Sequence, residues 1–198
     1  ILKEPASCFA KVAFLDFLTR KRNGDFTRVA ALFGFPGADR TELLNTELDI
    51  TPIPSTEVQE FINLSSQRYH RILRELFRKH DPAHLFMGAA HCPKQSIDWY
   101  EGATRHVDFL GFNIYGLSLG WVERDMDRLL KADTPFAVLE YAFVTESRGY
   151  RAYSGNNTVR TQTDRGTGFR IFTEQAAVNP LCLGFGYFIY WDQPVSRR

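Results

Sequence analysis

Hydrophobic positions in this chain follow two patterns that alternate along most of its length. Apolar residues spaced three and four apart, with capping residues at the ends, predict helices over 8–22, 25–32, 56–79, 97–104, 123–131 and 163–179. Short runs that are apolar throughout predict strands over 84–90, 107–115, 136–141 and 181–190. The stretch 34–54, rich in Gly, Pro, Asp and Thr, is predicted to be a long loop with one helical turn.

The helices and strands predicted after residue 56 alternate, which indicates βα units and a parallel sheet. Continuous hydrophobicity supports this, because it is typical of strands covered on both faces. Four such strands fit half of a (β/α)8 TIM barrel, with neighbouring strands in sequence order and right-handed crossovers. They also fit a complete small doubly wound sheet with 145–161 as its binding loop. The half-barrel is favoured, and antiparallel pairing between 107–114 and 136–140 would exclude it.

Polar and aromatic residues follow the apolar runs at the carboxyl ends of three predicted strands. The run PFAVLE ends on Glu140, VDFLGFNIY ends on Asn113 and Tyr115, and LCLGFGYFIYWDQ ends on Trp191 and Gln193. In a β/α barrel, residues at this end of the strands build the active site. A carboxylate together with an amide, a phenol and an aromatic ring suggests sugar chemistry.

Structural interpretations compete with these functional ones. Asn113 and Tyr115 are two positions apart and should share a face of the strand, but Asn113 could start a turn while Tyr115 packs at the rim. Glu140 could be a buried ion-pair partner of Arg105 or Arg165 instead of a catalytic carboxylate. The structural and functional interpretations place these side chains differently, so their positions in the structure can distinguish them.

The remaining candidates for sugar binding are aromatic or polar residues near strand ends. Trp191 could stack on the apolar C–H face of a sugar, or it could be a core aromatic. Gln193 follows it closely and is a candidate substrate contact. His91 follows the first predicted strand, where it could contact a sugar hydroxyl or serve only as a capping or structural residue.

Two features lie at or before the start of the last predicted helix. Thr163 or Asp164 is expected to be its N-cap, which is a structural role. The preceding loop, 145–161, holds Tyr150 and Tyr153 and could form a lid over a sugar groove.

Composition narrows the classes of function. The 198 residues are 44% apolar, and the net charge of +1, from 24 basic and 23 acidic residues, gives no reason to expect a nucleic-acid partner. Cys8, Cys92 and Cys182 are far apart, and the histidines lack ligand spacing, so neither a metal nor a cofactor is expected. No apolar run is long enough to cross a membrane, so no membrane partner is expected.

The strand-end motifs resemble those of the clan A glycoside hydrolases, and most closely the β-agarase and β-galactosidase-type enzymes. The resemblance covers nearly the whole chain, because the first helices and loop, 8–50, are similar to the segment after the fourth barrel strand in that family. The motifs that carry it are DPAHLFMG, VDFLGFNIYG, PFAVLEYAF and VRTQTDRGTGFRIFTEQAAVNPLCLGFGYFIYWDQP.

This resemblance implies that residues 1–198 form the carboxyl-terminal part of a single catalytic barrel, supplying strands five to eight. It implies that Glu140 is the nucleophile, that Tyr115 contacts the nucleophile or the sugar, and that Trp191 is a platform beside the cleaved bond. The implied activity is retaining hydrolysis of β-galactosidic bonds in a polysaccharide such as agarose. The family resemblance also implies a secreted or periplasmic protein.

Retaining hydrolysis needs a second carboxyl group roughly 5–5.5 Å from the nucleophile. The family takes it from an Asn-Glu pair ending the fourth strand, which does not appear in this chain. Glu47 has no apolar strand before it, and Glu4 precedes a proline. The chain also has no initiator Met, so we expect the acid/base to lie upstream in a longer gene product. Residues 1–198 alone should be inactive and should pair with the missing amino-terminal half of the barrel or with themselves.

Two other functions fit the same residues. One is a non-catalytic carbohydrate-binding barrel, or a fragment, that lacks its acid/base. The other is a different clan A activity, such as a mannanase or a glucanase, because loops rather than the barrel decide the substrate.

Overall fold

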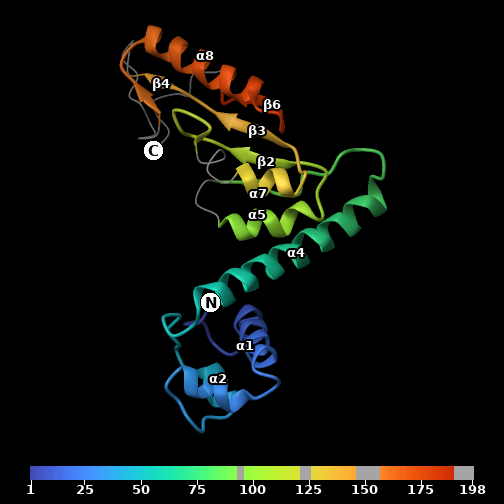
Figure 1. The fold of residues 1–198 in the computed structure, drawn as a ribbon, viewed down its shortest axis with the longest axis vertical. Coiled ribbons are helices and arrows are strands. Elements are labelled where there is room, and N and C mark those ends of the chain that lie inside the picture. The colour runs from blue at the N-terminus through green and yellow to red at the C-terminus, as the bar shows by residue number, and fades with distance from the viewer. Residues whose placement is uncertain (93–95, 121–125, 146–156, 190–198) are drawn as a thin grey trace. The chain divides into compact units, whose positions relative to one another are not determined.

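The computed structural model describes residues 1–92, 96–120, 126–145 and 157–189. The chain divides into two compact units, Ile1–Leu64 and Ser65–Arg198. Helix α4 (Ser55–His80) runs through the boundary between them (Figure 1). Each unit has its own apolar core.

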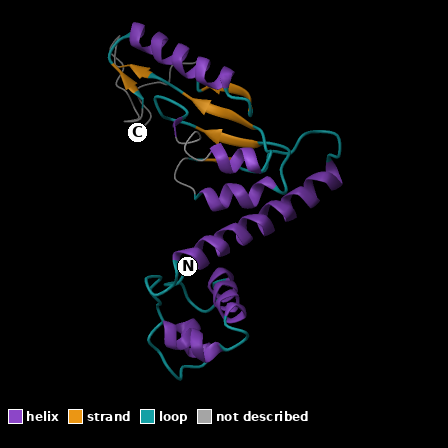
Figure 2. Cartoon of the chain, viewed as in Figure 1, coloured by secondary structure: helices purple, strands orange, loops and turns teal. Residues whose placement is uncertain are grey.

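The first unit consists of helices and loops (Figure 2). It contains α1 (Phe9–Lys21), α2 (Phe26–Leu32), α3 (Arg40–Asn45) and the first turns of α4. Asp25 caps α2 by accepting hydrogen bonds from the next backbone amides, and Asp39 and Glu42 form a capping box at α3. These elements confirm the predicted helices at 8–22 and 25–32 and the single helical turn in the loop after them.

A buried lysine ties the first unit together. Lys11 on α1 is 1% exposed, and its ammonium donates hydrogen bonds to the carbonyls of Glu4, Leu44 and Thr46 at 2.9, 2.7 and 2.7 Å. All three ammonium protons therefore have acceptors, which offsets the cost of burying the charge. The contact joins the amino-terminal segment to the carboxyl end of α3.

The second unit is built on a four-stranded parallel sheet. Its strands are β1 (Ala90–His91), β2 (Leu110–Asn113), β3 (Phe136–Tyr141) and β6 (Cys182–Tyr187). They pair in the order β1-β2-β3-β6, which is the order of the chain, and all three pairings are parallel (Figure 1). This confirms the predicted parallel α/β fold and strand order. A separate two-stranded parallel ladder joins β4 (Val144–Thr145) to β5 (Thr158–Val159).

The helices of this unit share one apolar core with the sheet. Besides α4, they are α5 (Ile97–Thr104), α7 (Met126–Lys131) and α8 (Gln162–Val178). Strand residues at alternate positions face this core, which they form with residues of the helices: Leu110, Phe112, Phe136 and Val138 with Tyr100, Ala103, Leu129, Phe172 and Ala176. The strand order contains no reversal of the kind that marks the switch point of a doubly wound sheet.

The predicted strand 84–90 is wrong in its extent, because only Ala90 and His91 pair with β2. The backbone before them is bent: Gly88 has a φ of +72°, and a Cβ there would lie 2.8 Å from Cδ2 of His70. The amide of Phe86 donates to the carboxylate of Asp108 at 2.7 Å instead of to a strand. Side-chain and ring contacts therefore replace the expected ladder.

Two other strands are shorter than predicted. Strand β2 begins at Leu110, because Asp108 just before it is held by Arg74 and Arg78 on α4, at 3.3 and 2.6 Å. It ends at Asn113, so Tyr115 lies beyond the paired residues. Strand β6 ends at Tyr187, and the last predicted residue of that strand, 190, lies outside the described residues.

Candidate functional site

Glu140 and Tyr115 meet at the carboxyl end of the sheet. Tyr115 follows β2, Glu140 is the penultimate residue of β3, and the phenol of Tyr115 donates a short hydrogen bond to Oε2 of Glu140. Parallel pairing of the two strands brings their ends to one edge, which is why residues 25 positions apart come together. The structure thus joins two of the predicted site residues.

An irregularity in β3 aims Glu140 toward Tyr115. Phe136 and Val138 face the helices, and strict alternation would send Glu140 the same way. The register shifts here, however, both against β2 and against β6. Tyr141 takes the helix-facing position instead and stacks on Phe172 of α8, with ring centroids 4.2 Å apart and an interplanar angle of 4°. Such bulges re-aim side chains and are frequent beside active sites.

The face that receives Glu140 lies opposite the helix-facing core. Ile114 is fully buried in that core, so its neighbours Asn113 and Tyr115 point to the other face of the strand, as predicted. The hydrogen bond between Tyr115 and Glu140 requires the carboxylate to lie on this second face.

The environment of Tyr115 keeps its phenol protonated. Partial burial raises the pKa of Tyr115 strongly, and the hydrogen bond to Glu140 and the negative charge of that carboxylate raise it further. The ring also meets Phe188 edge-on, with centroids 6.5 Å apart. Tyr115 is therefore a fixed hydrogen-bond donor to the carboxylate over the physiological pH range.

Asn113 lies beside this pair, directly across from Glu140 in the β2–β3 register. Its Oδ1 is buried and has no hydrogen-bond partner among the described residues. Buried polar atoms in native proteins are nearly always satisfied, so this acceptor is available to an external donor such as a hydroxyl. The predicted role of Asn113 in substrate binding remains a prediction that this geometry accommodates.

His91 lies in a different environment. It is fully buried, and its ring packs against Tyr100 at 5.2 Å, Phe112 at 5.8 Å and His70 at 5.8 Å between centroids. These neighbours belong to the sheet, α4 and α5, which is the setting expected for a structural residue. Its predicted contact with a sugar hydroxyl remains a prediction.

Arg105 and Arg165 were the alternative ion-pair partners predicted for Glu140. Arg165 donates through Nε to Oη of Tyr187 at 3.1 Å, and Tyr187 in turn bonds the carbonyl of Phe143 at 3.1 Å. In the part of the chain that the structure describes, Glu140 forms no ion pair with Arg105 or Arg165. The carboxylate is instead held by a neutral donor.

The N-cap of the last helix, α8, is a different residue from the one predicted. Thr161 is the N-cap of α8, and Asp164 completes a capping box three residues later. The prediction of Thr163 or Asp164 as N-cap was wrong by this shift, which moves the helix start to Gln162.

Other predicted residues lie outside the described ranges. They are Trp191, Gln193, Tyr150, Tyr153 and most of the proposed lid loop. Among the described residues no group of His, Cys, Asp and Glu side chains could hold a metal ion. No described helix is long and apolar enough to cross a membrane.

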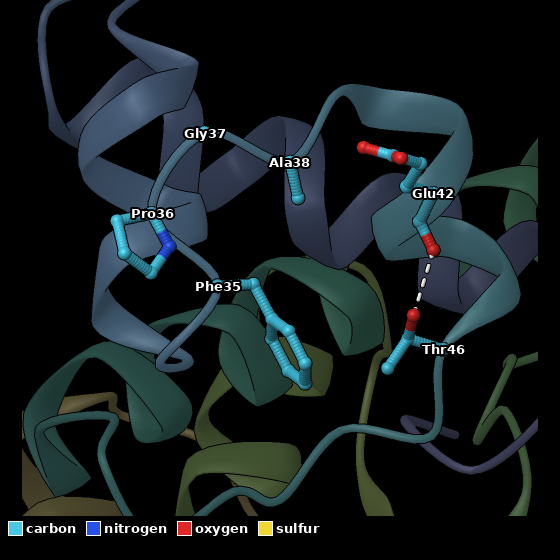
Figure 3. A pocket seen from close by; sticks show the side chains of 6 residues that line it. All are labelled: Phe35, Pro36, Gly37, Ala38, Glu42 and Thr46. Atoms are coloured by element: carbon cyan, nitrogen blue, oxygen red, sulfur yellow. Dashed lines mark hydrogen bonds between the residues drawn. The ribbon is translucent and has the colours of Figure 1, made fainter.

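An open pocket of about 560 Å³ lies in the first unit, where sequence patterns predicted a long loop with one helical turn (Figure 3). Its lining residues are Phe35, Pro36, Gly37, Ala38, Glu42 and Thr46. The hydroxyl of Thr46 donates to the carbonyl of Glu42 at 2.8 Å, and the Glu42 carboxylate accepts from the amide of Asp39 at 2.8 Å. These polar groups serve the local fold around α3.

Comparison with known proteins relates this chain to agarases. No protein-family model matches the chain. Over 145 residues, 70% of the chain, it is 27% identical to Beta-agarase B from Vibrio sp. (strain JT0107), and the match covers 14% of that protein.

Solved structures give the same picture for the fold. An agarase, AgWH50C, matches 98% of the chain with a TM-score of 0.81 and 24% identity. An exo-β-agarase matches 98% with a TM-score of 0.82 and 20% identity. The chain covers 28% and 26% of these two proteins. It is therefore agarase-like in sequence and fold, and it spans about a quarter of the solved agarases and a smaller share of Beta-agarase B.

Proposed function

We propose that this chain carries the nucleophile of a retaining glycoside hydrolase that cleaves β-galactosidic bonds in agarose. The observation that carries the proposal is the Tyr115–Glu140 hydrogen bond at the carboxyl end of a parallel sheet, in an agarase-like chain. A strand-end carboxylate that is held by a neutral donor, and that pairs with no arginine among the described residues, is suited to attack on a sugar.

In this mechanism Glu140 forms a covalent bond to the anomeric carbon as the glycosidic oxygen departs with a proton from a second carboxyl group. Water, deprotonated by that second group, then displaces Glu140 and restores it, with net retention at the anomeric carbon. Tyr115 bonds Oε2 of Glu140. Oε1 accepts no hydrogen bond from any described residue, so we assign the attack to it.

The second carboxyl group is proposed to lie outside residues 1–198. Three carboxylates of the second unit are held in ion pairs: Asp108 binds Arg74 and Arg78, while Asp98 and Glu101 bind Arg128 at 3.0 and 2.5 Å. These ion pairs leave them poorly suited to donate a proton to a leaving group. The family resemblance implies the same assignment.

The proposed scaffold is half of a β/α barrel. Strands in chain order, with α4, α5, α7 and α8 contributing to one core, support this arrangement over a doubly wound sheet, which needs a reversal in strand order. In this scaffold Asn113, Trp191 and Gln193 are proposed to contact the oligosaccharide.

Hydrolysis assays on the complete protein test the proposal. Release of reducing ends from agarose, with little release from mannan or glucan, is expected for the wild type. The Glu140→Gln variant should lose turnover while it still binds agarose oligosaccharides, because it keeps the shape of the site without the nucleophile. Wild-type rates in that variant would exclude Glu140, and preferential cleavage of mannan would exclude the substrate class.

A further inference from the structure

We infer that Gly186 on β6 and Gly111 on β2 are positioning residues for Glu140, because the bulge that aims the carboxylate occupies the space of their missing side chains. This inference rests on the proposed nucleophilic role of Glu140. It concerns how the two strands that flank β3 fix the direction of that side chain.

Gly186 lies against the backbone that precedes Glu140. A Cβ at Gly186 would lie 2.9 Å from the carbonyl oxygen of Leu139 and 3.7 Å from its carbonyl carbon. That carbonyl belongs to the peptide group linking Leu139 to Glu140. Because this contact is with main chain, no change of rotamer can relieve it, and a side chain at 186 must displace either β6 or the peptide.

Gly111 lies against the side chain of Leu139. A Cβ at Gly111 would lie 2.6 Å from Cδ1 of Leu139 and 3.0 Å from Sδ of Met87. The Leu139 side chain therefore fills the space above Gly111 on the face that also carries Glu140. One neighbouring strand accommodates the side chain of Leu139, and the other accommodates its carbonyl.

These two contacts coincide with the irregular part of β3. Against β2 the register moves from Phe112–Val138 directly to Asn113–Glu140, which leaves Leu139 as the extra residue. Against β6 the register also shifts between Val138 and Tyr141. The residue that both glycines accommodate is thus the extra residue of the bulge, immediately before the carboxylate.

Gly184 provides a matched control on the same strand. It lies two positions before Gly186, so its Cα presents the same face of β6, but a Cβ there would meet nothing within 4 Å. It pairs with Ala137, two residues before Leu139; the register against β6 also shifts between Phe136 and Ala137, but that irregularity is separate from the one at Leu139. The Gly184→Ala variant therefore makes the same substitution as Gly186→Ala without the steric contact to the Leu139 carbonyl.

The consequence is an effect on rate more than on substrate affinity. A displaced Leu139–Glu140 peptide moves the carboxylate relative to Tyr115 and the anomeric carbon, and misplacement of about 1 Å costs about 100-fold in rate. Gly186→Ala should therefore lower kcat about 100-fold with a small change in KM. Gly111→Ala should have a weaker effect, about 10-fold, because the Leu139 side chain can move aside.

The experiment compares kcat, KM and the thermal unfolding midpoint for five variants of the complete protein on agarose oligosaccharides. They are Gly186→Ala, Gly184→Ala, Gly111→Ala, Leu139→Ala and the double variant Gly111→Ala/Leu139→Ala. The expected results are a large loss of kcat in Gly186→Ala, near wild-type kinetics in Gly184→Ala, and recovery of most of the Gly111→Ala loss in the double variant. Such recovery measures a direct contact, which a general loss of stability would not produce.

Wild-type kcat in Gly186→Ala would overturn the inference, and so would a Gly111→Ala defect that Leu139→Ala does not relieve. If Gly186→Ala does not fold, the Gly111–Leu139 pair alone decides the question. The Glu140→Gln variant distinguishes a failure of this inference from a failure of the proposed nucleophilic role of Glu140. An active Glu140→Gln enzyme refutes both, whereas an inactive one beside a fully active Gly186→Ala refutes only the positioning role.

Discussion

The phenol of Tyr115 donates a hydrogen bond to Oε2 of Glu140 across two neighbouring parallel strands. Two features of the chain create this contact: the parallel pairing of β2 with β3, and the bulge that turns Glu140 away from the helix-facing core. The donor in this contact is a neutral phenol, so the geometry of the carboxylate depends on a neutral donor.

Replacement of Tyr115 by Phe should lower kcat about 10- to 100-fold. The variant loses a hydrogen bond to a charged group, worth about 1.5–3 kcal/mol, from the reacting carboxylate. Steady-state kinetics on agarose oligosaccharides measures the effect. Tyr69→Phe is the control, because Tyr69 is 45% exposed on α4. A wild-type kcat in Tyr115→Phe would show that the contact has no role in turnover.

Replacement of Asn113 by Ala should weaken substrate binding without weakening the fold. Oδ1 of Asn113 has no acceptor role among the described residues, so the protein loses no hydrogen bond through that atom. A lost hydrogen bond to substrate of about 1.4 kcal/mol corresponds to roughly a 10-fold rise in KM. A lower unfolding midpoint with unchanged KM would instead support the interpretation of Asn113 as a turn residue.

Replacement of Lys11 by Met should destabilise the first unit by about 3 kcal/mol. The change removes the ammonium group, so the carbonyls of Glu4, Leu44 and Thr46 each lose the hydrogen bond that they accept from it. Denaturant unfolding, with hydrogen exchange to localise the effect to Ile1–Leu64, measures the loss. Lys3→Met is the control, since Lys3 is exposed. Equal stability of Lys11→Met and wild type would mean that the buried ammonium makes no net contribution.

His70 should make the stability of the second unit depend on pH. Its Nδ1 lies 2.9 Å from the carbonyl of Ser66 and donates to it, while Nε2 is buried without a partner among the described residues. Burial lowers the pKa of His70, and the charge of His106 lowers it further. The unfolded chain then binds the proton more readily, so stability is complete above the ordinary histidine pKa of about 6.5 and falls as the pH drops below it.

Unfolding curves between pH 5 and about 7.5 test this dependence. The His70→Gln variant should lose less stability on acidification than the wild type, whatever its stability at neutral pH. His80→Gln, at an exposed position on α4, should retain the wild-type dependence. Parallel curves for His70→Gln and the wild type would contradict the assignment.

Sequence patterns predicted the elements whose signals are local. Helix α5 agrees with its prediction at both ends, because Ser96 caps it and its apolar residues are regular. Strand β3 also agrees with its prediction at both ends. The face shared by Asn113 and Tyr115 followed from the two-residue period of a strand. Glu140 followed from its place at the end of an apolar run, and its contact with Tyr115 followed from the resemblance to agarases.

The features that were missed depend on contacts between distant residues. Strand 84–90 failed because Gly88 packs against the ring of His70 and Phe86 bonds Asp108, neither of which is visible in an apolar run. The bulge at Leu139 depends on how β3 registers against two other strands. An alternating pattern alone would have turned Glu140 toward the helices, away from Tyr115.

Covalent trapping of the enzyme would show directly whether Glu140 is the nucleophile. A 2-deoxy-2-fluoro β-galactosyl substrate with a good leaving group slows hydrolysis of the glycosyl-enzyme, so the sugar should remain bound to the attacking carboxylate. Peptide mapping by mass spectrometry then locates the adduct. If Glu140 is the nucleophile, one galactosyl adduct should form, on the peptide that contains Glu140, and none should form in Glu140→Gln. An adduct on another carboxylate, or turnover with inversion at the anomeric carbon and no adduct, would contradict it.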